Sequence, residues 1–210
     1  MHAQPAAILF DLDGTLVDSV PCIVRCFRHA FEARDLPVPA EPQVRALISL
    51  PLEARFARFA PDHVAALCAA YRDHYPRVFE RECAVFPGVT DLLAGLRARG
   101  YRLGIATTKR TPWATRFVEA LGLAPFIDRI QGTDDFPAKP APDVLWRALA
   151  ALGAQGRWMV GDTASDVLAG RAAGLQTYAV CWDGPPADEL TAAAPDELAP
   201  DLDRLATLVP

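Results

Sequence analysis

Long apolar runs are missing from this sequence. The first apolar stretch, residues 6–10, ends at Asp11 after only a few residues, which is too short for a signal peptide. No later uninterrupted apolar stretch reaches the length that a membrane-spanning helix needs. We therefore expect a protein that has no membrane partner.

The five cysteines are odd in number, scattered along the chain, and form no C-x-x-C pair. This usage favours a reducing cytoplasm as the compartment. The chain also has no excess of basic residues over acidic ones, and its formal net charge is −5. That balance argues against a nucleic acid as the partner.

Lysine is nearly absent, since Lys109 and Lys139 are the only lysines among the 21 lysine and arginine residues. Arginine serves at every other basic position, so these two are candidates for sites where a bulky guanidinium will not fit. The rest of the composition, 51% hydrophobic and 22% charged, is that of a globular protein with a sizeable core.

Two acids stand at the end of the first apolar run, where Asp11 and Asp13 follow residues 6–10. The run is typical of a strand buried on both faces of a parallel sheet, and ligands bind beyond the carboxyl ends of such strands. Gly14 then allows a tight turn and a close approach of the backbone to a ligand. Two carboxylates there repel each other and lose hydration, and a Mg²⁺ ion would relieve both costs.

From residue 86 onward, apolar strand patterns alternate with helical patterns. Strands are expected at about residues 101–106, 126–130, 157–160 and 175–181, with helices at about 89–99, 112–121, 143–152 and 164–173. Together with the first strand, this alternation predicts an α/β fold with a Rossmann-like, doubly wound parallel sheet. The chain after residue 181 is expected to form a peripheral helix and a tail.

Residues 18–82 contain helical patterns and no convincing strand. Helices are expected at about 21–34, 42–48, 52–59 and 62–82. We therefore expect an all-helical domain, residues 18–83, inserted directly after the first strand of a core domain made of residues 1–17 and 84–210.

Polar residues follow the strands of the expected sheet at the points where the strands end. After Asp11 and Asp13 come Thr107 and Thr108 behind the second strand, Lys139 in the loop after the third, and Asp162 and Asp166 behind the fourth. In a parallel sheet these ends lie on one edge. Carboxylates there could hold Mg²⁺, while hydroxyl, ammonium and backbone N–H groups could hold a phosphoryl group that another carboxylate attacks.

Four segments resemble, in order and separation, the four motifs of the haloacid dehalogenase superfamily of phosphatases. They are residues 11–18, residues 107–109, residues 139–143 and residues 161–166. The resemblance continues through residues 172–174 and 182–184, so it covers nearly the whole chain. The helical insertion resembles the cap domain of the phosphoglycolate phosphatase-like branch.

This resemblance implies a Mg²⁺-dependent phosphatase that hydrolyses a small phosphate monoester through an aspartyl-phosphate intermediate. Asp11 would be the nucleophile, and Asp13 would protonate the leaving oxygen and then activate water. Mg²⁺ would be held by Asp11, the main-chain carbonyl of Asp13, and Asp162. Asp166 would either contact the residues that bind the metal, without binding the metal directly, or hold Lys139. The groups expected to hold the phosphoryl oxygens are Thr107, Lys139 and the backbone of Leu12, Gly14 and Thr108.

The cap contains a departure from this pattern, because Ser49 stands where relatives commonly have glycine. The loop is expected to face the active site, so Ser49 and Leu50 are expected to influence substrate choice. Lys109 is expected to point away from the phosphoryl group.

Several alternatives share parts of this pattern. A dehalogenase would not need the second acid, Asp13, and a phosphonate hydrolase would need a cap lysine, which residues 18–82 lack. A phosphomutase uses the same four motifs and stays open. A phospho-acceptor signalling domain also combines acids, a threonine and a lysine, although it would order its acids differently and lack a cap. The resemblance makes 2-phosphoglycolate the default substrate, and sugar phosphates, nucleotides and pyrophosphate are alternatives. The sequence leaves the oligomeric state open.

Overall fold

The computed structural model describes residues 4–48, 50–182 and 186–209 of the 210-residue chain. The chain divides into two compact units, Met1–Val17 with Val85–Pro210, and Asp18–Ala84. The short strands β2 (Val17–Asp18) and β3 (Ala84–Val85) lie where the chain passes from one unit to the other, and they pair with each other.

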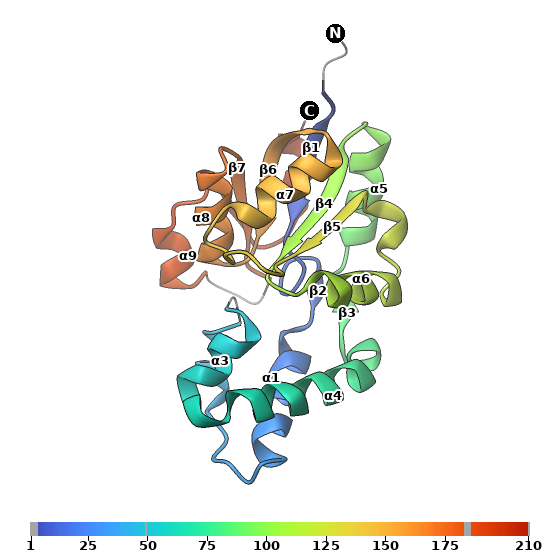
Figure 1. The fold of residues 1–210 in the computed structure, drawn as a ribbon. Helices are drawn as coiled ribbons and strands as arrows, with labels where there is room; N and C mark the ends of the chain where they lie inside the picture. The colour runs from blue at the N-terminus through green and yellow to red at the C-terminus, as the bar shows by residue number, and fades with distance from the viewer. Residues whose placement is uncertain (1–3, 49, 183–185, 210) are drawn as a thin grey trace. The chain divides into compact units, whose positions relative to one another are not determined.

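The larger unit is built on a six-stranded sheet with the order β5-β4-β1-β6-β7-β8, and neighbouring strands run parallel (Figure 1). The strands are β1 (Ala6–Phe10), β4 (Arg102–Thr107), β5 (Arg129–Gly132), β6 (Gln155–Gly161), β7 (Gln176–Val180) and β8 (Glu197–Ala199). The central strand β1 is apolar throughout, as a strand covered on both faces requires. The α/β class with a doubly wound parallel sheet is thereby confirmed.

Helices connect these strands along both faces of the sheet. They are α5 (Val89–Ala98), α6 (Thr111–Ala120), α7 (Asp143–Leu152) and α8 (Ala164–Ala172). Because crossovers between parallel strands are right-handed, α5 and α6 cover one face and α7 and α8 cover the other. On the second face, Leu9 and Met159 of the sheet belong to one buried cluster with Val144 and Leu145 of α7.

Two expectations about strands were wrong. The strand expected at 126–130 begins later, at Arg129, because a 3₁₀ turn η2 (Ala124–Phe126) precedes it and contains Pro125, which has no N–H for a sheet hydrogen bond. The tail after residue 181 contains a sixth strand, β8, in addition to the helices α9 (Asp188–Ala192) and α10 (Leu205–Leu208). This three-residue edge strand is too short to show an apolar pattern of its own, and its pairing with β7 defines it.

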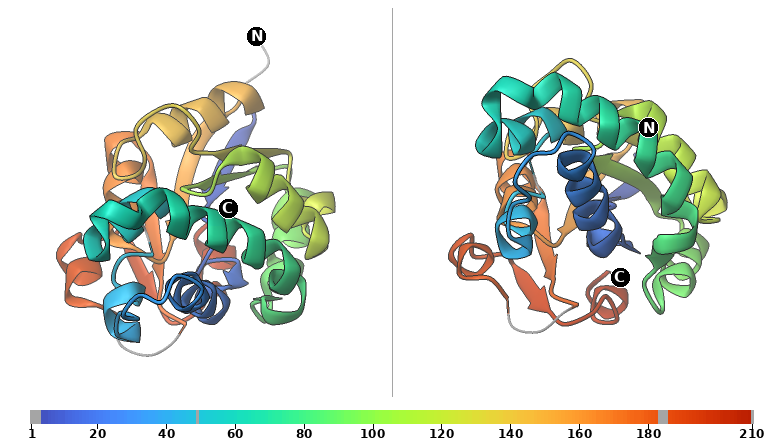
Figure 2. Two further views of the ribbon diagram at one scale, coloured as in Figure 1. Left: turned by 60° about the horizontal axis from the view of Figure 1, so that its bottom comes forward. Right: turned by 90° about the horizontal axis from the view of Figure 1, so that it is seen from below.

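The Asp18–Ala84 unit is helical. It contains α1 (Val20–Glu32), α2 (Glu41–Arg45), α3 (Leu52–Phe59), the 3₁₀ turn η1 (Pro61–His63) and α4 (Val64–Glu82). Both α1 and α3 pack on α4 (Figure 2). Aromatic rings fill this contact, with Phe27 and Phe56 stacked at 4.3 Å between ring centroids and Tyr71 meeting Phe56 edge-on at 6.2 Å. Each fully buried ring of this kind contributes roughly 1.5–3 kcal/mol of hydrophobic stabilisation.

In the parts of the chain that the structure describes, no helix is both long enough and apolar enough to span a bilayer.

Candidate active site

The candidate site lies at the carboxyl ends of three adjacent strands. Asp11 follows β1, and its N–H still donates to Val160 O of β6 at 2.8 Å, so its backbone is held by the neighbouring strand. Thr107 ends β4, and Asp162 directly follows β6. Since β1 lies between β4 and β6, the sheet itself brings the ends of these strands together.

Lys139 joins two of the carboxylates at this edge. Its Nζ donates to Asp11 Oδ1 at 2.8 Å, to Ala106 O at 3.1 Å, and to Asp166 Oδ1. The Lys139 side chain is only 2% exposed, so these oxygens take the place of water around the ammonium. Such charge-assisted hydrogen bonds in a buried place fix both partners in position.

Asp166 and Asp162 are each held by a hydroxyl group. Asp166 lies in the first turn of α8, and its Oδ2 accepts hydrogen bonds from Thr163 Oγ1 at 2.6 Å and Thr163 N at 3.1 Å. Asp162 Oδ1 accepts a hydrogen bond from Thr15 Oγ1 at 2.7 Å. The motif residues Thr15 and Thr163 therefore orient the acids, a role that their place in the sequence does not reveal.

Asp11, Asp162 and Asp166 form a carboxylate cluster, because one oxygen of each lies within 4.8 Å of the others. Oxygen donors of this kind suit a hard divalent cation. Asp166 belongs to this cluster and also accepts a hydrogen bond from Lys139, which is the second of the two roles that the resemblance implied for it. The Asp13 carboxylate is not a member, which leaves the main-chain carbonyl as the contribution expected from Asp13.

Burial and like charges shape the titration of this cluster. Burial raises the pKa of Asp11 to about 6 and outweighs the opposing attraction of Lys139. Loss of hydration, with the charges of Asp166 and Asp11, raises the pKa of Asp162 well above its ordinary value. Burial disfavours the charged form of Lys139, but the attraction of Asp11 and Asp166 prevails and raises its pKa. Three carboxylates thus face one ammonium, and a cation bound among them would stabilise their ionised forms.

The turn after Asp13 depends on glycine. Gly14 adopts a φ of +83°, and a Cβ built there would lie 2.3 Å from Asp162 Oδ2. Its N–H donates to Val17 O at 2.9 Å, so this N–H is engaged within the chain, in contrast to the expected contact with phosphate. Gly14 contributes instead the space that the Asp162 carboxylate occupies.

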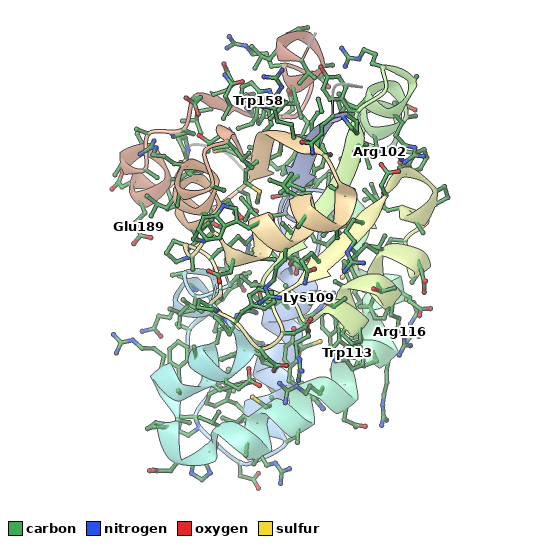
Figure 3. All side chains as sticks on the ribbon, turned by 45° about the horizontal axis from the view of Figure 1, so that its top comes forward. Arg102, Lys109, Trp113, Arg116, Trp158 and Glu189 are labelled. Carbon is green, nitrogen blue, oxygen red and sulfur yellow. The ribbon has the colours of Figure 1, made fainter. Side chains whose placement is uncertain are left out.

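Asp13 and Lys109 form a second, separate charged pair. Lys109 Nζ donates to Asp13 Oδ2 at 2.7 Å and lies 4.9 Å from the ring centroid of Phe117 on α6 (Figure 3 labels Lys109). Lys109 therefore contacts an acid of the first motif, while the expectation that it points away from the phosphoryl group stays a prediction. The rarity of lysine in the composition was a signal that Lys109 has a special place, but the residue type alone does not say which acid a lysine contacts.

The other expected phosphate-binding residues lie near the same edge. Thr107 is buried, and its Oγ1 accepts a hydrogen bond from Lys109 N at 3.2 Å. Thr108 is half-buried, and Leu12 is fully buried, with its carbonyl accepting from Leu16 N and Val17 N at 3.1 Å. These positions are compatible with the expected roles, which stay predictions.

The expected substrate-selecting loop belongs to the helical unit. Ser49 lies outside the described residues. Leu50 is half-buried, and its carbonyl accepts a hydrogen bond from Arg55 Nε at 2.7 Å, while Arg55 also donates to Ile48 O. The influence of Ser49 and Leu50 on substrate choice stays a prediction.

Several known proteins resemble this chain in sequence. Residues 8–180 match the family model described as haloacid dehalogenase-like hydrolase. Pyrophosphatase PpaX of Halalkalibacterium halodurans is 35% identical over 176 residues, which cover 82% of each chain. Phosphoglycolate phosphatase of Yersinia pseudotuberculosis is 32% identical over 200 residues, which cover 90% of this chain and 86% of the relative.

Solved structures agree with the sequence relatives. A haloacid dehalogenase-like family hydrolase from Streptococcus pneumoniae superimposes with a TM-score of 0.86 at 33% identity, covering 99% of this chain and 100% of the other. The match therefore includes both the sheet unit and the helical insertion.

The turn at Gly14 yields a matched pair of variants. Gly14 and Gly100 have φ angles of +83° and +86°, but a Cβ at Gly100 would meet no atom within 4 Å. We expect Gly14→Ala and Gly100→Ala each to lower the free energy of unfolding by about 1–2 kcal/mol, measured by urea denaturation, because of the left-handed backbone. Calorimetric titration should show weakened binding of a divalent cation in Gly14→Ala alone, because the new methyl group displaces the Asp162 carboxylate. Equal cation affinity in the two variants would contradict this role of Gly14.

Proposed function

This chain belongs to the haloacid dehalogenase-like hydrolases and is a phosphatase, and from that premise we propose a Mg²⁺-dependent reaction on a small phosphate monoester. In this proposal the phosphoryl group passes through a covalent intermediate on Asp11. The observation that carries it is the contact of Asp11 with Lys139 inside a carboxylate cluster at the end of β1. That arrangement combines a nucleophile, a buried cation and oxygen donors for a metal in one place.

The first chemical step uses the two acids of the first motif. An Asp11 carboxylate oxygen attacks phosphorus while the bond from phosphorus to the leaving oxygen breaks. Asp13 transfers its proton to that leaving oxygen. In the second step a water molecule gives its proton to Asp13 and attacks phosphorus, which releases phosphate and regenerates the Asp11 carboxylate.

The remaining residues bind and orient the phosphoryl group. Lys139 lies beside the attacking carboxylate, where its charge would stabilise the negative charge of the transferring group. Thr107, Thr108 and the backbone of Leu12 would supply further hydrogen bonds to the phosphoryl oxygens. Their positions at the ends of β4 and β1 support this role.

The carboxylate cluster fits Mg²⁺ because it supplies hard oxygen donors and an excess of negative charge. Asp11, Asp162 and the main-chain carbonyl of Asp13 would hold the ion, with Asp166 close behind. When bound, Mg²⁺ would offset the repulsion between the phosphate ester and the acids that surround it.

The substrate is proposed at the level of a small phosphorylated metabolite. One relative is named a pyrophosphatase and another a phosphoglycolate phosphatase, at 35% and 32% identity, so similarity alone does not separate the two substrates. We keep 2-phosphoglycolate as the default. A panel of phosphorylated metabolites that includes pyrophosphate, ranked by kcat/KM, tests this choice.

Asp11 is the residue on which the proposed chemistry depends most directly. We expect Asp11→Asn to abolish phosphate release, because an amide cannot act as the carboxylate nucleophile. Asp13→Asn should reduce kcat by about 10²–10⁴, the usual contribution of proton transfer. Release of inorganic phosphate with Mg²⁺ is the measurement, and circular dichroism checks the fold of each variant. Substantial turnover by purified Asp11→Asn would contradict the mechanism, and phosphate transfer without release would indicate a phosphomutase.

Metal binding should depend on pH, because the pKa of Asp11 is raised to about 6. Below this pH Asp11 carries a proton that Mg²⁺ must displace, whereas at pH 7.5 the carboxylate is already ionised. We therefore expect Mg²⁺ to bind about tenfold more weakly at pH 5 than at pH 7.5 in calorimetric titrations. Asp162→Asn should lose most of the binding at both pH values, and the exposed Asp188→Asn should behave as wild type. An affinity that does not change with pH would argue against Asp11 as a ligand.

Lys139 should not tolerate exchange for arginine. Its side chain is 2% exposed between Asp11 and Asp166, so the larger planar guanidinium cannot take the same position. We expect Lys139→Arg to lower kcat by about 10²–10³, as for loss of a group that stabilises transition-state charge. The control is Arg110→Lys at a largely exposed side chain, which should leave kcat close to wild type. Retention of activity in Lys139→Arg would show that the charge alone suffices.

A further inference from the structure

The side chain of Asp13 has a different partner from the carboxylate cluster two residues away. Its Oδ2 lies 2.7 Å from Lys109 Nζ, and the two side chains are 12% and 15% exposed. A hydrogen bond from an ammonium group that is largely shielded from water is held more firmly than a surface contact, and Oδ2 can accept it whether Asp13 carries a proton on its other oxygen or is ionised. The partner of Asp13 is therefore a defined part of the site.

The backbone of Lys109 is held from two sides. Its N–H donates to Thr107 Oγ1 at 3.2 Å, and its carbonyl accepts from Thr133 N at 3.0 Å. Gly132 of β5 makes this approach possible, because a Cβ there would lie 2.2 Å from Lys109 O. The loop after β4 is thus fastened to the end of β5, which fixes the point from which the Lys109 side chain extends.

The ammonium group of Lys109 is also held at its far end. Nζ lies 4.9 Å from the centroid of the Phe117 ring, on α6, and Phe117 is 1% exposed. A cation over an aromatic face gains electrostatic stabilisation, and the buried ring restricts where the ammonium can move. Lys109 therefore presents its charge to Asp13 from a position determined by β4, β5 and α6.

We propose that Lys109 is a positioning residue for proton transfer by Asp13. This inference rests on the proposed function. As Asp11 forms its bond to phosphorus and the ester bond breaks, the proton of Asp13 moves to the leaving oxygen, and Asp13 becomes a carboxylate. Lys109 holds that carboxylate in place and stabilises its new charge, and it holds the same group ready to accept the proton of the attacking water.

The proposal predicts that the loss of rate on removing Lys109 depends on the leaving group of the ester. A basic alkoxide leaving group needs the proton from Asp13, whereas p-nitrophenolate leaves with little help. Loss of Lys109 should therefore affect alkyl phosphates far more than p-nitrophenyl phosphate. A residue with a merely structural role would change the rates of all esters by one common factor.

The test compares wild type, Lys109→Met, Lys109→Gln and Lys109→Arg on p-nitrophenyl phosphate, phenyl phosphate, phosphoglycolate and glycerol 3-phosphate with Mg²⁺. We expect Lys109→Met and Lys109→Gln to lose about 10²-fold in kcat/KM on the two alkyl esters, within the range of proton-transfer effects, and less than tenfold on p-nitrophenyl phosphate. Lys109→Arg should recover part of the loss, because it restores a cation. Lys109→Gln keeps a polar side chain of moderate length and serves where Lys109→Met proves unstable in urea denaturation.

Two controls make the result specific to Asp13. Arg110→Met removes the neighbouring exposed cation and should leave the dependence on the leaving group unchanged. In an Asp13→Asn background, Lys109→Met should add little further loss on alkyl esters, because residues that act as a unit are not additive. A uniform loss across all esters, or a full additional loss in Asp13→Asn, would overturn the inference. Failure of the wild type on every ester would overturn the proposed function and this inference with it.

Discussion

The site is organised by one buried ammonium group. Lys139 lies between Asp11 and Asp166 with almost no exposure to water, and it offsets part of the charge that three carboxylates bring to one edge of the sheet. Leaving one member of such a buried pair without its partner costs roughly 3–5 kcal/mol. The acids therefore depend on Lys139 for their stability, and their remaining excess of negative charge creates the demand for a divalent cation.

The parallel sheet makes this concentration of charge possible. Asp11, Asp162 and Asp166 come from segments about 150 residues apart, yet β1 and β6 are neighbours and end at the same edge. Small residues and hydroxyls then complete the arrangement, because Gly14 leaves room for the Asp162 carboxylate while Thr15 and Thr163 orient the acids. The strands bring the groups together, and these local contacts determine where each oxygen points.

Asp11 and Asp13 illustrate how neighbouring acids acquire different tasks. In a continuous strand, residues two apart would face the same side, but β1 ends at Phe10, so Asp11 and Asp13 both lie beyond the regular strand. Asp11 therefore meets Lys139 among the other carboxylates, and Asp13 meets Lys109 in the loop after β4. One acid is suited to nucleophilic attack and the other to proton transfer, although both belong to one short motif.

The sequence by itself determined the fold class, the helical nature of residues 18–82, and which polar residues end the strands. The spacing of apolar residues and the residue types at the strand ends are local properties of the chain. The order and separation of the four motifs also indicated the family. Only the tertiary structure revealed the edge strand β8 and the later start of β5. A three-residue strand is defined by its pairing with the neighbouring strand, and the 3₁₀ turn that contains Pro125 precedes β5. The tertiary structure also decided that Lys109 meets Asp13 and that Thr15 holds Asp162. Contacts between segments far apart in sequence depend on how strands and helices pack, and no local pattern encodes them.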